Sequence, residues 1–218
     1  MLRSTSGAQR ASTHTGAPRR GPRWAAAFGA AVLALAIGVP SAAASTSSVI
    51  TPDATVTPST TSSYPWYSVE TYYLQLVNCT RTGGWVLSDG TCKGYGSGHY
   101  SAYVKPLVLV AGISNSVSRP YAKLLATKGI CSHFADHDPG YRLRRAGYYR
   151  TNWGENIGCR DGYSTAKAAV LASHLKFQAE KSTNGGHWKN IKNATYLYIG
   201  IGVWRYGTRT RLVTDFYR

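Results

Sequence analysis

The sequence has few acidic residues, with nine Asp and Glu against 25 Lys and Arg, so its formal charge is +16 at pH 7. The first 44 residues hold five arginines and no acid, and removing them lowers that charge only to +11. Most of the basic excess therefore belongs to the rest of the chain. Such an excess favours partners whose surfaces are acidic.

The sequence also lacks an apolar run of the ~20 residues that a membrane-spanning helix needs. Its longest uncharged apolar run, residues 24–39, follows the arginines and precedes Pro40 and the small residues 41–44. This order is typical of a signal peptide. We expect residues 1–44 to be removed after about Ala44, and the mature protein to be secreted, extracellular and not integral to the membrane. The alternative is an uncleaved anchor.

Residues 45–63 have too few large apolar side chains to form a core, because Ser, Thr, Pro and small residues dominate them. We interpret them as a linker. The remaining residues, 64–218, have the length of one compact domain.

No C-x-x-C pair is present among the four cysteines. An even number of cysteines in an exported chain predicts disulfides rather than metal thiolates. Cys79 with Cys92, and Cys131 with Cys159, each bracket a short polar loop that contains glycine. We predict these two pairings, with free buried thiols as the alternative.

Apolar spacing predicts helices from Ser68, from about Arg119 to Gly129, and from Thr165 to Asn184. Pro120 either occupies the first position of the second helix or kinks it. Two strand-like runs, 195–204 and 211–217, close the chain as a hairpin. In the first run, glycines 200 and 202 leave one face without side chains, so another group can approach the backbone closely. The pattern predicts an α+β domain.

Several motifs of nucleophilic and nucleotide chemistry are absent. The sequence has no G-x-S-x-G elbow, no H-E-x-x-H and no phosphate-binding glycine loop. Ser132 adjoins His133, but adjacent side chains seldom form a nucleophile and base pair. We do not expect a conventional enzyme.

The sequence resembles the CAP superfamily, the domain of cysteine-rich secretory proteins, antigen 5 and pathogenesis-related proteins, also called SCP-like. Four segments share the resemblance, residues 76–92, 131–148, 152–159 and 185–203. Ser132-His133, Gly154-Glu155-Asn156-Ile157, and Gly186-His187 ahead of Ile199-Gly200-Ile201-Gly202-Val203 carry the resemblance, in the style of actinobacterial members. It covers roughly Tyr67 to the C-terminus. It implies a three-layer α-β-α sandwich with an open cleft.

The resemblance also implies that two histidines and two glutamates line the cleft. Here these are His133, Glu155 and His187, with Glu180 as the candidate for the second acid. Imidazoles and carboxylates that converge suit Zn²⁺, with His133, His187 and Glu155 as ligands. The alternative is a hydrogen-bonded polar cluster that shapes the cleft and binds no metal.

Two further histidines, His137 and His174, are possible site residues. His137 lies four residues after His133 between two aspartates, yet Pro139-Gly140 would break a helix there, so we expect a solvated loop. His174 lies on the apolar stripe of its helix and is expected to be a hydrogen-bonded core residue.

A basic, tyrosine-containing stretch follows, with arginines at positions 142, 144, 145 and 150. We interpret Arg142, Arg144, Arg145 and Arg150 as a surface for acidic envelope polymers or anionic lipid headgroups, with a merely solvated face as the alternative. Nucleic acid is not an expected partner of an exported protein.

Together these observations predict a secreted, non-enzymatic binding module that holds a lipid, an envelope component or a metal in a His/Glu-lined cleft. The alternative is a metal-assisted or His/Glu-assisted hydrolase that uses the same cleft. A fold resemblance does not choose between them.

Overall fold

The structure, a computed structural model, describes residues 64–218. The expected signal peptide, residues 1–44, and the expected linker, residues 45–63, lie outside the described residues. Within residues 64–218, none of the helices combines the length and the apolar character that crossing a membrane requires.

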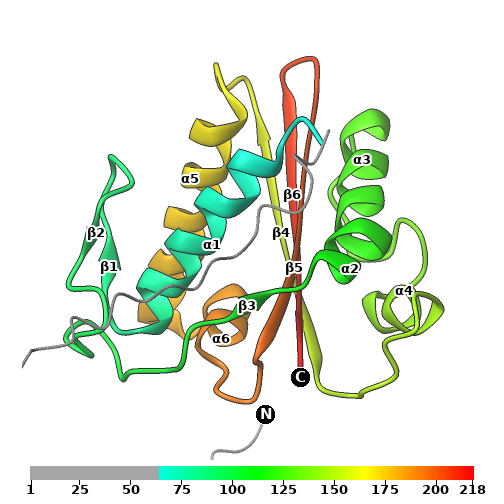
Figure 1. Ribbon diagram of the computed structural model, residues 1–218. Helices are drawn as coiled ribbons and strands as arrows, with labels where there is room; N and C mark the ends of the chain where they lie inside the picture. The colour runs from blue at the N-terminus through cyan, green and yellow to red at the C-terminus, as the bar shows by residue number, and fades with distance from the viewer. Residues whose placement is uncertain (1–63) are drawn as a thin grey trace, which may run out of the picture. The chain divides into compact units, whose positions relative to one another are not determined.

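A four-stranded sheet forms the middle layer of the described residues (Figure 1). β5 (Tyr198–Tyr206) and β6 (Arg209–Tyr217) form the antiparallel hairpin that the sequence predicts. β4 (Trp153–Asp161) pairs antiparallel with β6, and the short β3 (Val108–Leu109) pairs parallel with β5. The order is therefore β3-β5-β6-β4.

β4 is the strand that the sequence analysis did not predict. Its centre contains glycines and the polar residues Glu155 and Asn156, which are poor strand formers. The glycines are explained by packing, because a Cβ at Gly158 would lie 2.4 Å from the Ser173 hydroxyl on the helix above it. The family motif Gly154-Glu155-Asn156-Ile157 is thus the inner part of an edge strand.

Helices cover both faces of the sheet (Figure 1). One layer contains α1 (Tyr67–Arg81), α5 (Ala166–Ala179), the 3₁₀ turn η2 (Glu180–Thr183) and α6 (Gly186–Lys192). The other contains α2 (Ala111–Ile113), the π-helical turn η1 (Ser114–Ser118), α3 (Arg119–Lys128) and α4 (Pro139–Arg145). A small ribbon, β1 (Trp85–Val86) with β2 (Cys92–Lys93), stands beside the first layer. The predicted α+β class and three-layer arrangement are confirmed.

The side chains of β5 and β6 point alternately to the two faces of the sheet, and a hydrophobic core lies on each face. Ile199, Ile201 and Val203 pack against α1, α5 and α6 in the larger core. On the other face, Val213 packs against Tyr121 and other side chains of α3. The period-two alternation of these strands places one set of side chains in each core.

The first three predicted helices form, with revised ends. Thr165 caps α5 by accepting a hydrogen bond from the Ala168 N–H, and Gly129 ends α3 in the left-handed conformation. Pro120 occupies the first turn of α3 and does not kink it, because a π-helical turn precedes the helix. α5 ends at Ala179, earlier than predicted, and α6 was not predicted.

Glycines 200 and 202 allow the second helical layer to contact the backbone of β5. A Cβ at Gly200 would lie 2.3 Å from a methyl group of Ile113, and one at Gly202 would lie 2.2 Å from the backbone of Ser118. The close approach predicted from the sequence is therefore confirmed. It lets the Ser114 hydroxyl accept a hydrogen bond from the Ile201 N–H at the edge of the sheet.

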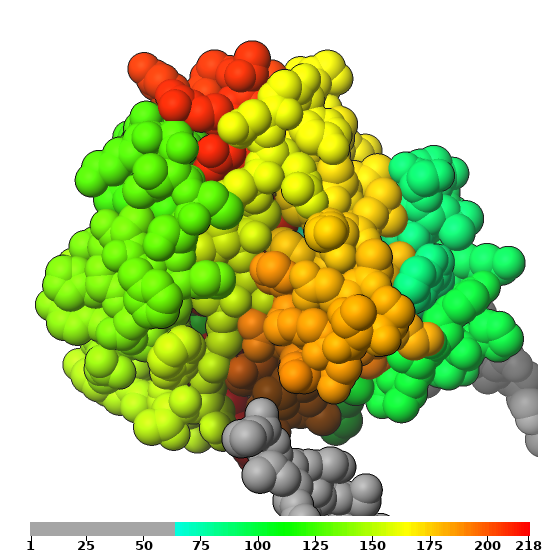
Figure 2. Space-filling model, turned by 180° about the vertical axis from the view of Figure 1, so that it is seen from behind, coloured from blue at the N-terminus to red at the C-terminus, as the bar shows by residue number. Residues whose placement is uncertain are grey.

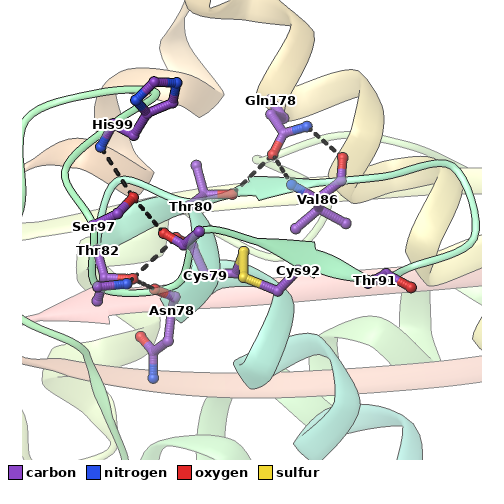
Figure 3. The surroundings of a disulfide bond; sticks show 12 residues. Asn78, Cys79, Thr80, Thr82, Val86, Thr91, Cys92, Ser97, His99 and Gln178 are labelled. Carbon is purple, nitrogen blue, oxygen red and sulfur yellow. Dashed lines mark hydrogen bonds between the residues drawn. A yellow bond between two sulfur atoms is a disulfide. The ribbon is translucent and has the colours of Figure 1, made fainter.

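Both predicted disulfides are confirmed. Cys79–Cys92 joins α1 to the ribbon of β1 and β2, where the Gln178 side chain hydrogen-bonds both the N–H and the carbonyl of Val86 (Figure 3). Cys131–Cys159 joins the loop after α3 to β4. The second disulfide therefore links the segment before His133 to the strand that carries Glu155.

Candidate functional site

The four cleft residues named by the family resemblance line one open pocket of about 460 Å³. It lies between the two helical layers at β4, and Figure 2 shows the surface hollowed between the yellow-green segments and the orange α6. The lining residues are His133, Glu155, Asn156, Glu180, Thr183, Gly185, Gly186, His187 and Asn190. Loop, strand and helix ends that are far apart in sequence thus meet here.

His133 is held by a carboxylate that is itself held by an arginine. Its Nδ1 lies 2.6 Å from Oε1 of Glu155, and Oε2 of Glu155 accepts from the Arg142 guanidinium. The Glu155 side chain is 1% exposed, whereas that of His133 is 42% exposed. The imidazole therefore faces the pocket with a buried ion pair behind it.

Arg142 corrects the sequence analysis. It was expected in the basic surface, but it is 3% exposed and lies 3.5 Å from the centre of the Tyr121 ring. Its guanidinium also donates to the carbonyl oxygens of His133 and His137 at 2.9 and 2.7 Å. Arg142 therefore fixes the loop that carries His133. Arg144, Arg145 and Arg150 are exposed, as expected.

His187 is held in the same way by the other glutamate. Its Nδ1 lies 2.6 Å from Oε1 of Glu180, and its backbone N–H donates to Oε2 at 3.0 Å. The ring also stacks on Phe177, with centroids 4.2 Å apart. Gly185 makes room for this pair, because a Cβ there would lie 2.5 Å from Oε2 of Glu180.

The charge state of Glu180 follows from these contacts. Partial burial alone would raise the pKa of Glu180, but hydrogen bonds from the His187 ring and from the N–H groups of His187 and Trp188 outweigh it. Together with the charge of His187, they hold the pKa of Glu180 below its ordinary value. Glu180 is therefore ionised at neutral pH and accepts a hydrogen bond from the imidazole.

Two asparagines that the sequence analysis did not single out connect the halves of the pocket. Asn156 donates to the carbonyl of His187 at 3.1 Å, and Asn190 donates to the Asn156 side chain at 2.8 Å and to the Glu155 carbonyl at 3.1 Å. Asn156 belongs to the family motif, which was the available signal. Nothing in the sequence points to Asn190.

The geometry defines which imidazole atoms are available. A carboxylate at Nδ1 favours the tautomer with a proton on that nitrogen, which leaves an unprotonated Nε2. Neither His133 Nε2 nor His187 Nε2 hydrogen-bonds another of the described residues. Histidines oriented in this way are typical metal ligands.

The carboxylate oxygens of Glu155 and Glu180, by contrast, already have hydrogen-bond partners. Both oxygens of Glu155 are used by His133 and Arg142, so its expected role as a metal ligand is replaced by a role in holding His133. Within residues 64–218, no group of three or more His, Cys, Asp or Glu side chains is arranged to hold a metal ion. A metal in this pocket would therefore have two protein ligands, His133 and His187.

A second buried carboxyl lies behind Glu155. Asp215 is opposite Glu155 in the register of β4 and β6, is fully buried, and accepts a hydrogen bond from the Ser118 hydroxyl at 2.6 Å. Burial and the charge of Glu155 raise the pKa of Asp215. The sequence analysis did not single out this residue.

The other candidates lie outside the pocket. His174 is fully buried beside Tyr73 and hydrogen-bonds the Thr80 hydroxyl at 2.9 Å, as a core histidine should. His137 contacts Asp136 and stacks on Tyr141. Pro139-Gly140, expected to break a helix, begins α4 instead, because the preceding Asp138 caps it.

No protein-family model and no curated protein matches the sequence. Among solved structures, the chain is similar to an extracellular protein containing an SCP domain from Bacillus anthracis, at 21% identity and a TM-score of 0.47. The match covers 69% of this chain and 40% of that one, so this chain spans less than half of the Bacillus protein.

It is also similar to NaASP2, solved with Zn²⁺, at 16% identity and a TM-score of 0.46, covering 69% of this chain and 79% of that one. An outer surface protein from Borrelia burgdorferi matches at 12% identity and a TM-score of 0.48, covering 70% and 94%. The described fold is similar to that of SCP-domain proteins. The identities are low, so function is inferred below from the side chains of this chain.

Proposed function

We propose that this chain is an exported CAP-type binding module whose cleft binds a divalent transition metal ion through His133 and His187. The observation that carries the proposal is that two imidazoles, each with a carboxylate at Nδ1, share one pocket. The two disulfides support export, because such bonds persist in oxidising compartments.

The donor set fits Zn²⁺ better than Mg²⁺ or Ca²⁺, because imidazole nitrogen suits transition metals and the harder ions prefer oxygen ligands. With two protein ligands, water or a ligand group would complete the coordination, and the affinity would be below that of a closed structural site. When bound, zinc supplies a Lewis acid that can fix an anionic or carbonyl group in the cleft.

Calorimetric titration of metal-free protein with Zn²⁺ tests the proposal. We expect saturable heat that weakens in acid, because a ligating nitrogen must be unprotonated. His133→Ala and His187→Ala should each remove it. His99→Ala is the matched control, because His99 is exposed and outside the pocket. Absence of saturable heat from folded wild-type protein would contradict metal binding and leave a polar cluster that shapes the cleft.

The hydrolase alternative predicts a different experimental result, namely catalytic turnover. It requires zinc-dependent turnover of an ester, amide or glycan that disappears in His133→Ala and is not restored by metal. Binding without turnover supports the module.

The exposed arginines favour a second candidate function, attachment to acidic envelope material. Arg144, Arg145 and Arg150 are exposed, and Tyr149 beside them is 75% exposed. Cationic side chains next to an open aromatic ring suit phosphate or carboxylate groups on polymers or lipids. Binding to anionic vesicles or acidic polymers, measured by co-sedimentation at rising salt, tests this candidate.

A further inference from the structure

A second open groove, of about 590 Å³, is lined by residues of the first described segment, of η1, of α3 and of β5. Its lining residues are Tyr64, Pro65, Asn115, Arg119, Pro120, Lys123 and Trp204. None of them lines the His/Glu pocket. A ligand here would therefore be independent of the cleft.

Two aromatic rings and two prolines line this groove. The Tyr64 and Trp204 rings are 6.1 Å apart between centroids and are tilted by 45° to one another, and Pro65 and Pro120 complete the walls. Aromatic faces carry partial negative charge and attract the slightly positive C–H groups of a ring that lies on them. The shape and the chemistry therefore suit a ring rather than a small free ion.

Of the two cations that line the groove, one is already neutralised. Arg119 donates to both carboxylate oxygens of Glu70, at distances from 2.6 to 3.1 Å, and its guanidinium lies 4.1 Å from the centre of the Tyr64 ring. The Glu70 side chain is fully buried. This arginine is therefore a fixed part of the wall and adds no net charge.

Lys123 is the other cation. It is exposed, its Nζ lies 4.8 Å from the centre of the Trp204 ring, and it belongs to none of the ion pairs among residues 64–218. The groove thus has one uncompensated, movable positive charge at its aromatic wall. Asn115 accepts from Arg119 through its oxygen, which leaves its amide N–H groups as donors.

We infer that this groove binds a sugar ring that carries an acidic group, either a uronic acid or a sugar phosphate. The sugar ring lies against Trp204 and the prolines. Lys123 moves away from the indole and pairs with the acidic group, and Asn115 donates a hydrogen bond to a sugar hydroxyl. A neutral sugar would leave the lysine unpaired, and an inorganic anion would leave the aromatic wall unused.

Calorimetry on the purified exported chain tests this with four probes: oligogalacturonate, a phosphorylated mannose oligomer, a neutral maltooligosaccharide of the same length, and inorganic phosphate. We expect at least one acidic oligomer to bind about tenfold more tightly than the neutral one and than phosphate, as a charge-assisted contact implies. The oligomer that binds identifies the acid as carboxylate or phosphate.

Variants separate the groove from general electrostatics. Lys123→Gln should weaken binding of the acidic oligomer about tenfold, and Trp204→Phe, which keeps an aromatic ring in the core, should weaken it to a smaller extent. Lys128→Gln removes the same charge from an exposed lysine at the end of α3, outside the groove, and should leave binding unchanged. His133→Ala with His187→Ala should also leave it unchanged, so a failure of the metal proposal does not affect this test.

Three results would overturn the inference. Neither acidic oligomer binds; inorganic phosphate binds as tightly as the acidic oligomer; or Lys123→Gln and Lys128→Gln weaken binding equally.

Discussion

Glu155 and Asp215 face each other across β4 and β6, and both are buried in the same sheet. One buried arginine, Arg142, donates to Glu155, while Asp215 relies on the Ser118 hydroxyl. Two ionised carboxylates side by side would repel each other, and the raised pKa of Asp215 means that Asp215 is protonated at neutral pH. Glu155 contacts His133 through one carboxylate oxygen and Arg142 through the other.

Asp215→Asn is therefore predicted to stabilise the protein increasingly as pH rises. Because the folded pKa of Asp215 is above its unfolded value, its stability contribution is complete below about pH 4 and is lost as pH rises through the folded pKa. Melting temperatures of wild type and variant should diverge between about pH 4 and 8, the interval between the unfolded and the folded pKa of Asp215. The exposed Asp89→Asn is the control, and an Asp215→Asn curve parallel to the wild type would refute this role.

His174 should make the protein sensitive to acid. Burial lowers the pKa of His174 to about 3. Its stabilising contribution is complete above the unfolded pKa near 6.5 and falls by up to about 1.4 kcal/mol per pH unit towards the folded value. Urea unfolding of His174→Gln between pH 7 and 4 should show a smaller loss of stability than wild type. Equal losses would mean that other groups govern acid unfolding.

Replacing the buried Glu155 should destabilise the fold more than replacing an exposed glutamate would. Glu155→Ala leaves Arg142 buried without its carboxylate, which is expected to cost about 3–5 kcal/mol. Replacing both residues together, as Arg142→Met with Glu155→Leu, should restore part of that loss. If the double variant loses as much stability as the two single variants lose together, the two residues contribute independently.

The two disulfides should differ in their effect on the cleft. By loop length, removing either should cost about 3 kcal/mol in the chain-entropy model. Only Cys131→Ser with Cys159→Ser should also weaken zinc binding, because that bond links the His133 segment to β4. Calorimetry on both double variants compares them, and equal zinc affinities would contradict the link.

The exposed arginines should govern binding to acidic envelope material. Arg144→Gln, Arg145→Gln and Arg150→Gln together are expected to reduce co-sedimentation with anionic vesicles and to flatten its salt dependence, because exposed charges are screened beyond about 10 Å at 0.1 M salt. Arg142 is left intact because it is buried. Unchanged co-sedimentation would make these arginines a solvated face.

Local patterns predicted much of the fold. The alternation around Ile201 and the glycine at 129 each act within a few residues, so the hairpin and the end of α3 followed from the sequence, whereas the end of α5 did not. β4 and α6 did not, because β4 is stabilised by its pairing with β6 and α6 has only seven residues. Tertiary contacts outweigh local preference in such segments.

The candidate site was predicted only as far as its family motifs extend. The His and Glu residues came from motifs, but the burial of Arg142 depends on Glu155 from a separate segment, and a basic stretch in the sequence looks the same whether it is exposed or not. Asp215 carried one weak signal, a charge within a predicted strand, and that strand is buried from Thr210 to Tyr217. Pairing across strands is what makes it part of the site.

The most direct test of the central claim is nitrogen-15 NMR of the histidine side chains in metal-free protein before and after Zn²⁺ is added. We predict that His133 and His187 both carry their proton on Nδ1, and that zinc shifts their Nε2 resonances while His99 and His174 stay unchanged. Protons on Nε2, or Nε2 resonances that do not move at saturating zinc, would contradict metal binding in this cleft.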